Sequence, residues 1–205
     1  MRRVVVAALA AVPLGVVLGV AGQEGEEVVQ QLKWVFALGT PWLVVCWAAG
    51  AVAGTRLAGA VAGSVALTVA TGTYYGLMIG HGHRSLAGAF IVVGWGAASV
   101  AAGGLFGLAG GAWRGGSAPV RVAAVVLLAG AMAGEAVLLA GEWPQRVTPL
   151  LEAELAAAGA TPFLLVRPWR ALPLALVLIA AAALLLAATE DQVRETMRYA
   201  GWSGL

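Results

Sequence analysis

Six runs of about 20 predominantly apolar residues divide this chain, and they constrain its fold more than any other feature. A helix of about 20 apolar residues is long enough to cross the hydrocarbon core of a bilayer. The runs cover residues 4–21, 36–54, 57–80, 86–111, 122–141 and 171–189. We therefore expect an all-α polytopic membrane protein with six transmembrane helices, forming a single transmembrane domain over residues 1–205.

The composition agrees with a lipid environment. The 205 residues are 61% hydrophobic and 11% charged, with a mean hydropathy of +0.90, whereas soluble domains carry about 25% charged residues. The formal charge of +2 comes without a compact basic stretch, so no nucleic-acid partner is expected. The single cysteine, Cys46, lies in an apolar run and is typical of a packing residue. The sequence contains no HExxH, GxGxxG or Walker-type motif, so we expect no cofactor and favour a protein that is not an enzyme.

The loops suggest an orientation. The segments "GTRLAG" and "AWRGGSAPVR" are short, basic and free of acids. Because cytoplasmic loops carry an excess of Lys and Arg, this pattern places both termini in the cytoplasm of a multi-pass protein of the inner (plasma) membrane. Six alternating spans put Arg167 and Arg170 on the outer side, beside the glutamates.

Two of the outer connections have helical periodicity. Residues 23–35 place Val28 and Leu32 on one face, and residues 150–157 combine Leu151 and Leu155 with two glutamates. We expect two short amphipathic helices that bury Leu32 and Leu151 and either lie at the outer surface or fold over the bundle as lids.

Residues 38–45 (LGTPWLVV) resemble residues 159–166 (GATPFLLV). An internal duplication of the kind found in transporters is one interpretation. We favour the other, in which Thr-Pro followed by an aromatic residue is suited to beginning a helix.

Glycines recur at four-residue spacing within the runs. The pairs are Gly50 with Gly54, Gly59 with Gly63, Gly103 with Gly107, Gly107 with Gly111, and Gly130 with Gly134. Such spacing lets helix backbones approach closely. We expect internal packing, and one such face could also meet a partner subunit or a second copy.

Glu135 is the strongest candidate for a functional residue. It stands in "LLAGAMAGEAVLLAG", with no other charge within a turn or two. An acid inside a span costs several kcal/mol, so it usually faces a cavity or a partner. We expect Glu135 to face the bundle interior and to contact Tyr74 or Tyr75, which lie at the same depth. A hydrogen-bonded packing role is the alternative.

Other polar groups extend this candidate site. Thr71 shares a helical stripe with Tyr75, Trp95 is too deep to be a belt tryptophan, and Arg84 is placed to contact an anion. His81 and His83 form an H-x-H pair in a Gly-rich turn, but no third ligand is near, so no metal site is expected.

The six spans, with both ends cytoplasmic and a polar outer half, resemble the substrate-binding S-components of energy-coupling-factor transporters. Those proteins meet a transmembrane partner through an A-x-x-x-A face on the first helix, a spacing that Ala7 and Ala11 match. The "GTPWLVV" segment with Tyr74 and Tyr75 is also similar to a group of small actinobacterial polytopic membrane proteins, a likeness that implies no activity.

Three hypotheses follow. The first is a solute-binding transport component with an outward-facing pocket between residues 57–80, 86–111 and 122–141. The residues expected to bind the solute are Glu135, Tyr74, Tyr75, Trp95, Arg84 and Thr71. The second is a structural or accessory membrane subunit without a ligand. The third is an intramembrane enzyme acting on a lipid, with Glu135 as acid or base.

Overall fold

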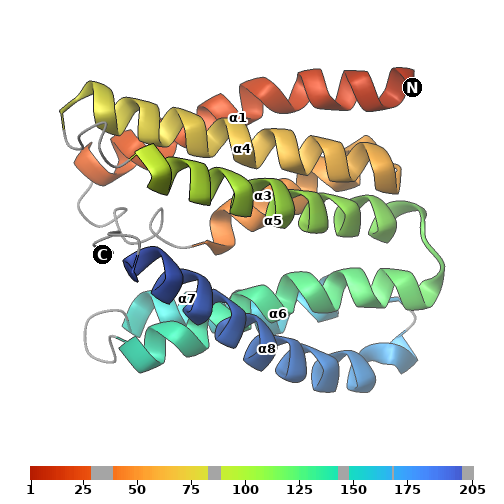
Figure 1. Ribbon diagram of the computed structural model, residues 1–205. Helices are drawn as coiled ribbons and strands as arrows, with labels where there is room; N and C mark the ends of the chain where they lie inside the picture. The colour runs from red at the N-terminus through yellow and green to blue at the C-terminus, as the bar shows by residue number, and fades with distance from the viewer. Residues whose placement is uncertain (29–38, 83–88, 143–147, 168, 200–205) are drawn as a thin grey trace.

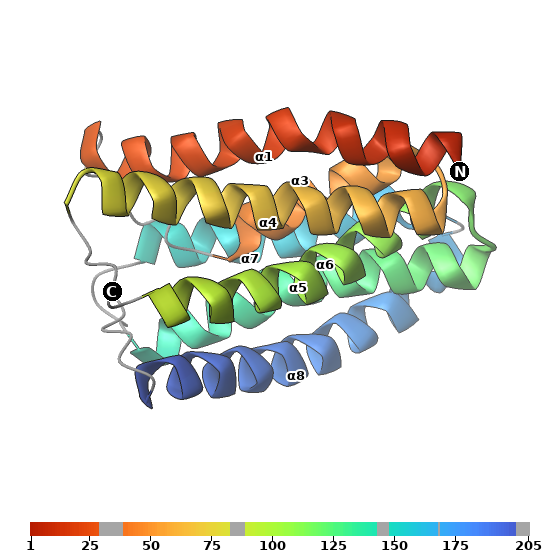
Figure 2. The same cartoon turned by 45° about the horizontal axis from the view of Figure 1, so that its top comes forward.

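The computed structural model describes residues 1–28, 39–82, 89–142, 148–167 and 169–199. In these ranges the chain forms seven α-helices and one short 3-10 helix (Figure 1). They are α1 (Arg2–Val28), α3 (Thr40–Ala53), α4 (Arg56–Gly80), α5 (Ala89–Gly115), α6 (Ala118–Glu142), α7 (Thr148–Leu165), η2 (Trp169–Ala171) and α8 (Leu172–Tyr199). Their axes run in broadly the same direction, as the two views in Figures 1 and 2 show.

Five helical segments in the described part of the chain are long and apolar enough to cross a membrane. They are Arg2–Glu24, Arg56–Gly80, Val92–Gly115, Ala118–Gly141 and Trp169–Thr196. The expected span over 36–54 appears instead as the 14-residue helix α3, and residues 36–38 lie outside the described ranges. At 1.5 Å per residue α3 is about 21 Å long, which is shorter than a hydrocarbon core of about 30 Å.

A tight turn joins α3 to α4 and makes them antiparallel neighbours. Gly54 ends α3 in the left-handed conformation (φ 75°), which glycine adopts without steric cost, and its N–H donates to the Gly50 carbonyl at 3.2 Å. The Thr55 side chain then accepts a hydrogen bond from the Ala58 amide at 3.3 Å and caps α4.

The helices pack in two groups. Helix α4 packs between α1 and α5, with α3 against α4 and α5, whereas α6 packs against α7 and α8. The groups meet where α6 contacts α5 and α3. The largest cluster of buried apolar residues lies at this junction and includes Trp47, Leu67, Phe106 and Leu128. Helix α3, although short, therefore lies at the centre of the structure.

Glycines allow α3, α4 and α5 to touch backbone to backbone, as their spacing predicted. A Cβ atom on Gly107 would collide with the Gly59 carbonyl, and one on Gly103 would collide with the Gly63 carbonyl. A Cβ atom on Gly50 would in turn meet the backbone of Gly107. On α6, Gly130 and Gly134 face α8 in the same way. Small residues thus determine how closely the helices approach each other.

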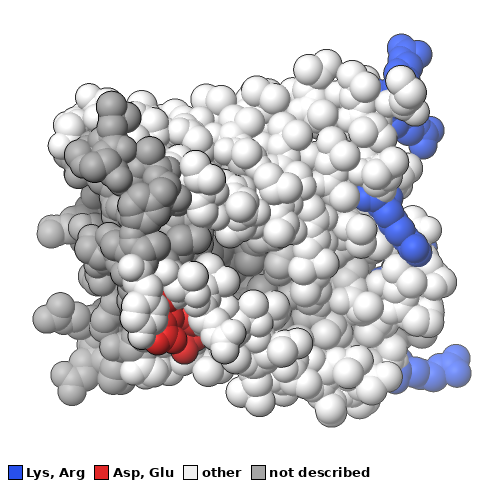
Figure 3. All heavy atoms as spheres, viewed as in Figure 1, with Lys and Arg blue, Asp and Glu red and all other residues white. Residues whose placement is uncertain are grey.

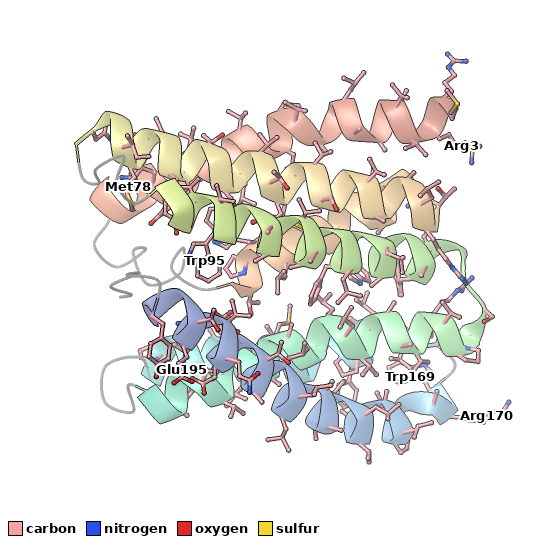
Figure 4. All side chains as sticks on the ribbon, in the orientation of Figure 1. Arg3, Met78, Trp95, Trp169, Arg170 and Glu195 are labelled. Atoms are coloured by element: carbon pink, nitrogen blue, oxygen red, sulfur yellow. The ribbon has the colours of Figure 1, made fainter. Side chains whose placement is uncertain are left out.

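Positive and negative charges separate to opposite ends of the bundle (Figure 3). Figure 4 places Arg3 and Arg170 at one end and Glu195 at the other. Among the described residues, the arginine end holds Arg2, Arg3, Arg56, Arg114, Arg121, Arg167 and Arg170, which lie at the termini of their helices or in the adjoining connections. The acidic end holds Glu24, Glu135, Glu152, Glu154, Glu190, Asp191 and Glu195, together with Arg194.

The expectation that both termini lie on one side does not hold for the described ends of the chain. Helix α1 begins at the arginine end and α8 finishes at the acidic end (Figures 1 and 2). The cause is α7, which runs alongside α6 instead of resting on the outer surface. Its last turn reaches the end of α5, where the Trp113 indole N–H donates to the Leu165 carbonyl at 3.4 Å. Arg167, Arg170 and Trp169 therefore lie at the arginine end and not at the expected outer side.

The prediction of two amphipathic surface helices needs correction. Residues 23–28 are the last turns of α1, and residues 29–35, with Leu32, lie outside the described ranges. Residues 150–157 are helical as predicted, and Leu151 is half-buried. They nevertheless belong to α7, which packs against α6: Thr161 lies against Met132, their Oγ1 and Sδ atoms 3.7 Å apart. Two glutamates made this helix resemble a surface segment, but Glu154 is buried in the bundle.

The two Thr-Pro segments have different structures, which argues against reading them as copies of one unit. Thr40 and Pro41 begin α3, the role predicted for them. Thr161 and Pro162 lie inside α7, where the Thr161 hydroxyl donates to the Ala157 carbonyl at 2.7 Å.

The glycine contacts give a direct test of the packing. Gly107→Ala should lower stability by about 1–3 kcal/mol, because its methyl group would meet backbone atoms that cannot rotate away. Gly96→Ala on the same helix is the matched control, since no described atom lies within 4 Å of its added Cβ. Alanine has the higher helix propensity, so the control should match or exceed the wild type in thermal unfolding in detergent. Equal melting temperatures for the two variants would contradict the packing.

Candidate functional site

The carboxylate of Glu135 binds the N-terminus of α3. Its Oε1 accepts a hydrogen bond from the Gly39 amide and its Oε2 one from the Thr40 amide, both at 2.6 Å. The first amides of a helix have no partner within the helix and carry the positive end of its dipole. Pro41 has no N–H, so Glu135 binds two of the few donors that this helix end presents. The side chain is 2% exposed.

This contact lies inside the bundle. Glu135 precedes the end of α6 at Glu142 by seven residues, which corresponds to a depth of about 10 Å along the helix. Helix α3 therefore begins within the bundle, about two turns in from the acidic end. A helix end at this depth needs an internal partner, because lipid offers none.

Helix α8 supplies a cation to the same carboxylate. Nη2 of Arg194 lies 3.8 Å from Oε1 of Glu135 and 2.6 Å from Oε1 of Glu190, one turn earlier on α8. A second hydrogen bond, from Nε of Arg194 to the same Glu190 oxygen, spans 3.0 Å. The Arg194 side chain is 10% exposed and that of Glu190 is 32% exposed, so the cluster reaches the surface at Glu190.

Glu154 on α7 adds a third carboxyl group. It is buried, and the charges of Glu135 and Glu190 act on it. The Thr40 hydroxyl lies close to the carboxyl groups of Glu135 and Glu154 but has no hydrogen-bond partner among the described residues. Oε2 of Glu154 has no hydrogen-bond partner among the described residues. We call Thr40, Glu135, Glu154, Glu190 and Arg194 the polar cluster.

The sequence placed Glu135 correctly in the interior but assigned it the wrong partner. Its contacts in the described structure are Gly39, Thr40 and Arg194, and not the tyrosines. Tyr74 instead packs edge-on against Trp42 of α3 and against Tyr75, with ring centroids 6.0 and 5.2 Å apart. The tyrosines thus lie on the α4 side of the beginning of α3, and Glu135 lies on the α6 side.

None of the other expected site residues that the structure describes has a hydrogen bond or ion pair with Glu135. Thr71 of α4 is buried and shares a hydrogen bond of 2.7 Å with Ser99 of α5, which holds those two helices together. Trp95 is half-buried on α5 toward the acidic end (Figure 4). Arg84 and His83 lie outside the described residues, and His81 is exposed at the end of α4.

Sequence reasoning missed Thr40, Glu154, Glu190 and Arg194 as members of one cluster. The burial of Glu154 could not be predicted because a neighbouring acid, Glu152, made the segment appear amphipathic. Glu190 and Arg194 have the i, i+4 spacing of an ion pair, and this spacing was the available signal. Their position beside α6 depends on the direction of α8, which follows from the course of α7.

The polar cluster holds more acidic groups than basic groups. Among the described residues it has three carboxyl groups and one guanidinium, which contacts Glu190 and Glu135, and the amides of α3 also bind Glu135. A buried carboxylate without compensation is costly, so it takes up a proton or a cation. The arrangement can therefore bind a positively charged group.

The fold and the cluster define the class of protein: an integral, multi-pass helical membrane protein with a buried polar site. DUF6518, described as a family of unknown function, matches residues 1–194, and the chain belongs to this family. No curated protein and no solved structure matches the chain. The comparisons thus give no support to the likeness to energy-coupling-factor S-components that the sequence suggested.

Replacing Glu135 tests its role at α3. Glu135→Leu should destabilise the protein by about 3 kcal/mol or more, since two buried amides lose a charged acceptor and hydrogen bonds to charged groups contribute about 1.5–3 kcal/mol each. Glu135→Gln should cost less, because it keeps one acceptor oxygen. The measurement is thermal unfolding in detergent, with Glu152→Gln on exposed α7 surface as the control. A Leu variant as stable as the wild type would contradict the cap.

Proposed function

We propose that the protein is the solute-binding component of a membrane transport system and that the polar cluster binds a positively charged solute. This keeps the transport hypothesis from the sequence but changes the place of the site. The expected pocket between α4, α5 and α6 gives way to a site between α3, α6, α7 and α8. Its residues are Thr40, Glu135, Glu154 and Glu190, with Arg194 as an internal cation.

The single observation that carries the proposal is the buried carboxyl group of Glu154. One of its oxygens has no hydrogen-bond partner among the described residues, and two further acids lie close to it. A protein that only packed its helices here would gain stability by replacing Glu154 with an apolar residue. A cationic or hydrogen-bond-donating solute would supply the missing partner.

The beginning of α3 inside the bundle supports the same role. Transporters commonly place the N-termini of discontinuous helices near the middle of the bilayer, where they bind anionic groups. Here the anionic group is the protein's own Glu135, held by the amides of Gly39 and Thr40. A cation bound beside Glu135 competes with the amides of Gly39 and Thr40 for its carboxylate, so the hydrogen bonds from Glu135 to α3 weaken. Solute binding and the position of α3 are coupled in this proposal.

The charge distribution supports an orientation. Positively charged segments remain in the cytoplasm, so we place the arginine end there, in the inner (plasma) membrane. The polar cluster then lies in the outer half and is reached from outside past Glu190.

A structural or accessory role is the second candidate. The observation that favours it is the close glycine packing of α3, α4 and α5 in the half of the bundle nearer the arginine end, which is typical of helices that serve only to pack. In that case the cluster would only fix α3, and no solute would bind it.

Cysteine labelling in whole cells tests the orientation. Cysteines at Gly82 and Tyr199, both exposed at the acidic end, should react with a membrane-impermeant reagent. A cysteine at Ser117, which is exposed between α5 and α6 at the arginine end, should react only after the membrane is opened. The wild type is the control, since Cys46 is buried. If only one of the cysteines at Gly82 and Tyr199 reacted in intact cells, the two positions would lie on different sides of the membrane. That result would contradict the course of α7 and α8.

The Glu154→Gln variant distinguishes the solute-binding role of the polar cluster from a role in packing alone. The variant should retain or exceed wild-type thermal stability, because it keeps the size of the side chain and removes an ionisable group from the buried cluster. It should also lose binding of cationic solutes, which we would measure by calorimetry with a panel of amines and matched neutral alcohols. Glu152→Gln, two residues away and exposed, should bind as the wild type does.

Two outcomes would count against the proposal. Binding of the amines by Glu154→Gln with unchanged affinity would show that the cluster is not their site. A wild type that binds none of the amines would favour the accessory role.

A further inference from the structure

A second feature, independent of the proposed solute site, is a groove of about 920 Å³ at the arginine end. It runs between α1 and α3, with Ala62 of α4 at its floor. Valines and alanines form most of its lining, and Leu14 and Val45 lie at its deep end. Its volume is at the upper end of the range of ligand pockets, roughly 300–1,000 Å³.

Three arginines line the groove at its open end, and no acidic residue of the described ranges does. Arg2 and Arg3 come from the start of α1, and Arg114 comes from the end of α5. All three are exposed, and Figure 4 shows Arg3 at this end of the bundle. The acids of the described chain lie at the opposite end. Guanidinium groups bind phosphate in a bidentate manner, so this opening is suited to an anionic headgroup.

The depth of the groove matches one leaflet. From Arg2 to Leu14, α1 advances 12 residues, or about 18 Å. Half of a hydrocarbon core of about 30 Å is about 15 Å. A transmembrane helix from a partner would need a groove of the full thickness, whereas a phospholipid needs a charged opening and an apolar channel that reaches the bilayer centre.

We propose that this groove binds an anionic phospholipid of the leaflet at the arginine end. Its phosphate contacts Arg2, Arg3 and Arg114, and an acyl chain lies along the alanines of α1 and α3. Basic pockets between transmembrane helices are known places for such headgroups. The site differs from ordinary lipid contact because three arginines from two helices line one apolar groove.

Native mass spectrometry of the detergent-purified protein tests the proposal. Phosphatidylglycerol and phosphatidylcholine with identical acyl chains are the probes. The wild type should bind phosphatidylglycerol more tightly. Removing each arginine should weaken its binding about fivefold, the effect of one basic residue near an anionic surface. The triple variant R2Q/R3Q/R114Q should lose the preference, and Arg170→Gln, at the same end but outside the groove, should keep it.

A second variant tests the channel with the arginines intact. Ala10 lines the groove and is exposed, so Ala10→Phe fills the space without crowding the core. It should lose bound phosphatidylglycerol while retaining wild-type thermal stability. Equal binding of the two lipids, or unchanged phosphatidylglycerol binding by both variants, would overturn the proposal. So would a co-purifying protein subunit that Ala10→Phe releases while lipid remains bound, because the groove would then hold a partner helix.

Discussion

The contact between Glu135 and the first amides of α3 holds the two groups of helices in register. Helix α6 belongs to one group and α3 to the other, and hydrogen bonds of 2.6 Å join them at a buried point. The contact explains why α3 can begin inside the bundle, where its free amides would otherwise lack partners. Arg194 of α8 also pairs with Glu135, and Thr40 lies close to Glu154 of α7. Groups from four helices thus meet around one carboxylate.

The arrangement has a cost that points toward function. Apolar side chains could join the same helices without burying charge, and replacing buried ion pairs by apolar groups is often neutral or stabilising. The structure instead concentrates three carboxyl groups and one guanidinium near the acidic end and leaves an oxygen of Glu154 without a partner among the described residues. At the other end, the arginines surround a groove with an apolar channel. We therefore propose different ligands for the two ends: cations at the polar cluster and anionic headgroups at the arginine groove.

Features that follow from long apolar runs, glycine spacing or an isolated charge could be predicted from the sequence. Five expected spans are long apolar helices, the glycine pairs mark close packing, and Glu135 is buried. The course of α7 could not be read in the same way, because Glu152 and Glu154 lower its hydropathy and only the tertiary structure shows that one of them is buried. That one helix changes the side on which Arg167, Arg170 and the end of α8 lie. The partner of Glu135 was missed because backbone amides carry no signal in side-chain identity.

Hydrogen–deuterium exchange at the beginning of α3 tests the central claim most directly. In the wild type the amides of Gly39 and Thr40 are bound to Glu135, so the peptide that contains them should exchange slowly. In Glu135→Leu the same peptide should exchange much faster, while peptides from the glycine-packed middle of α5 stay protected. Equal protection of the α3 peptide in the wild type and the variant would show that Glu135 does not hold this helix end.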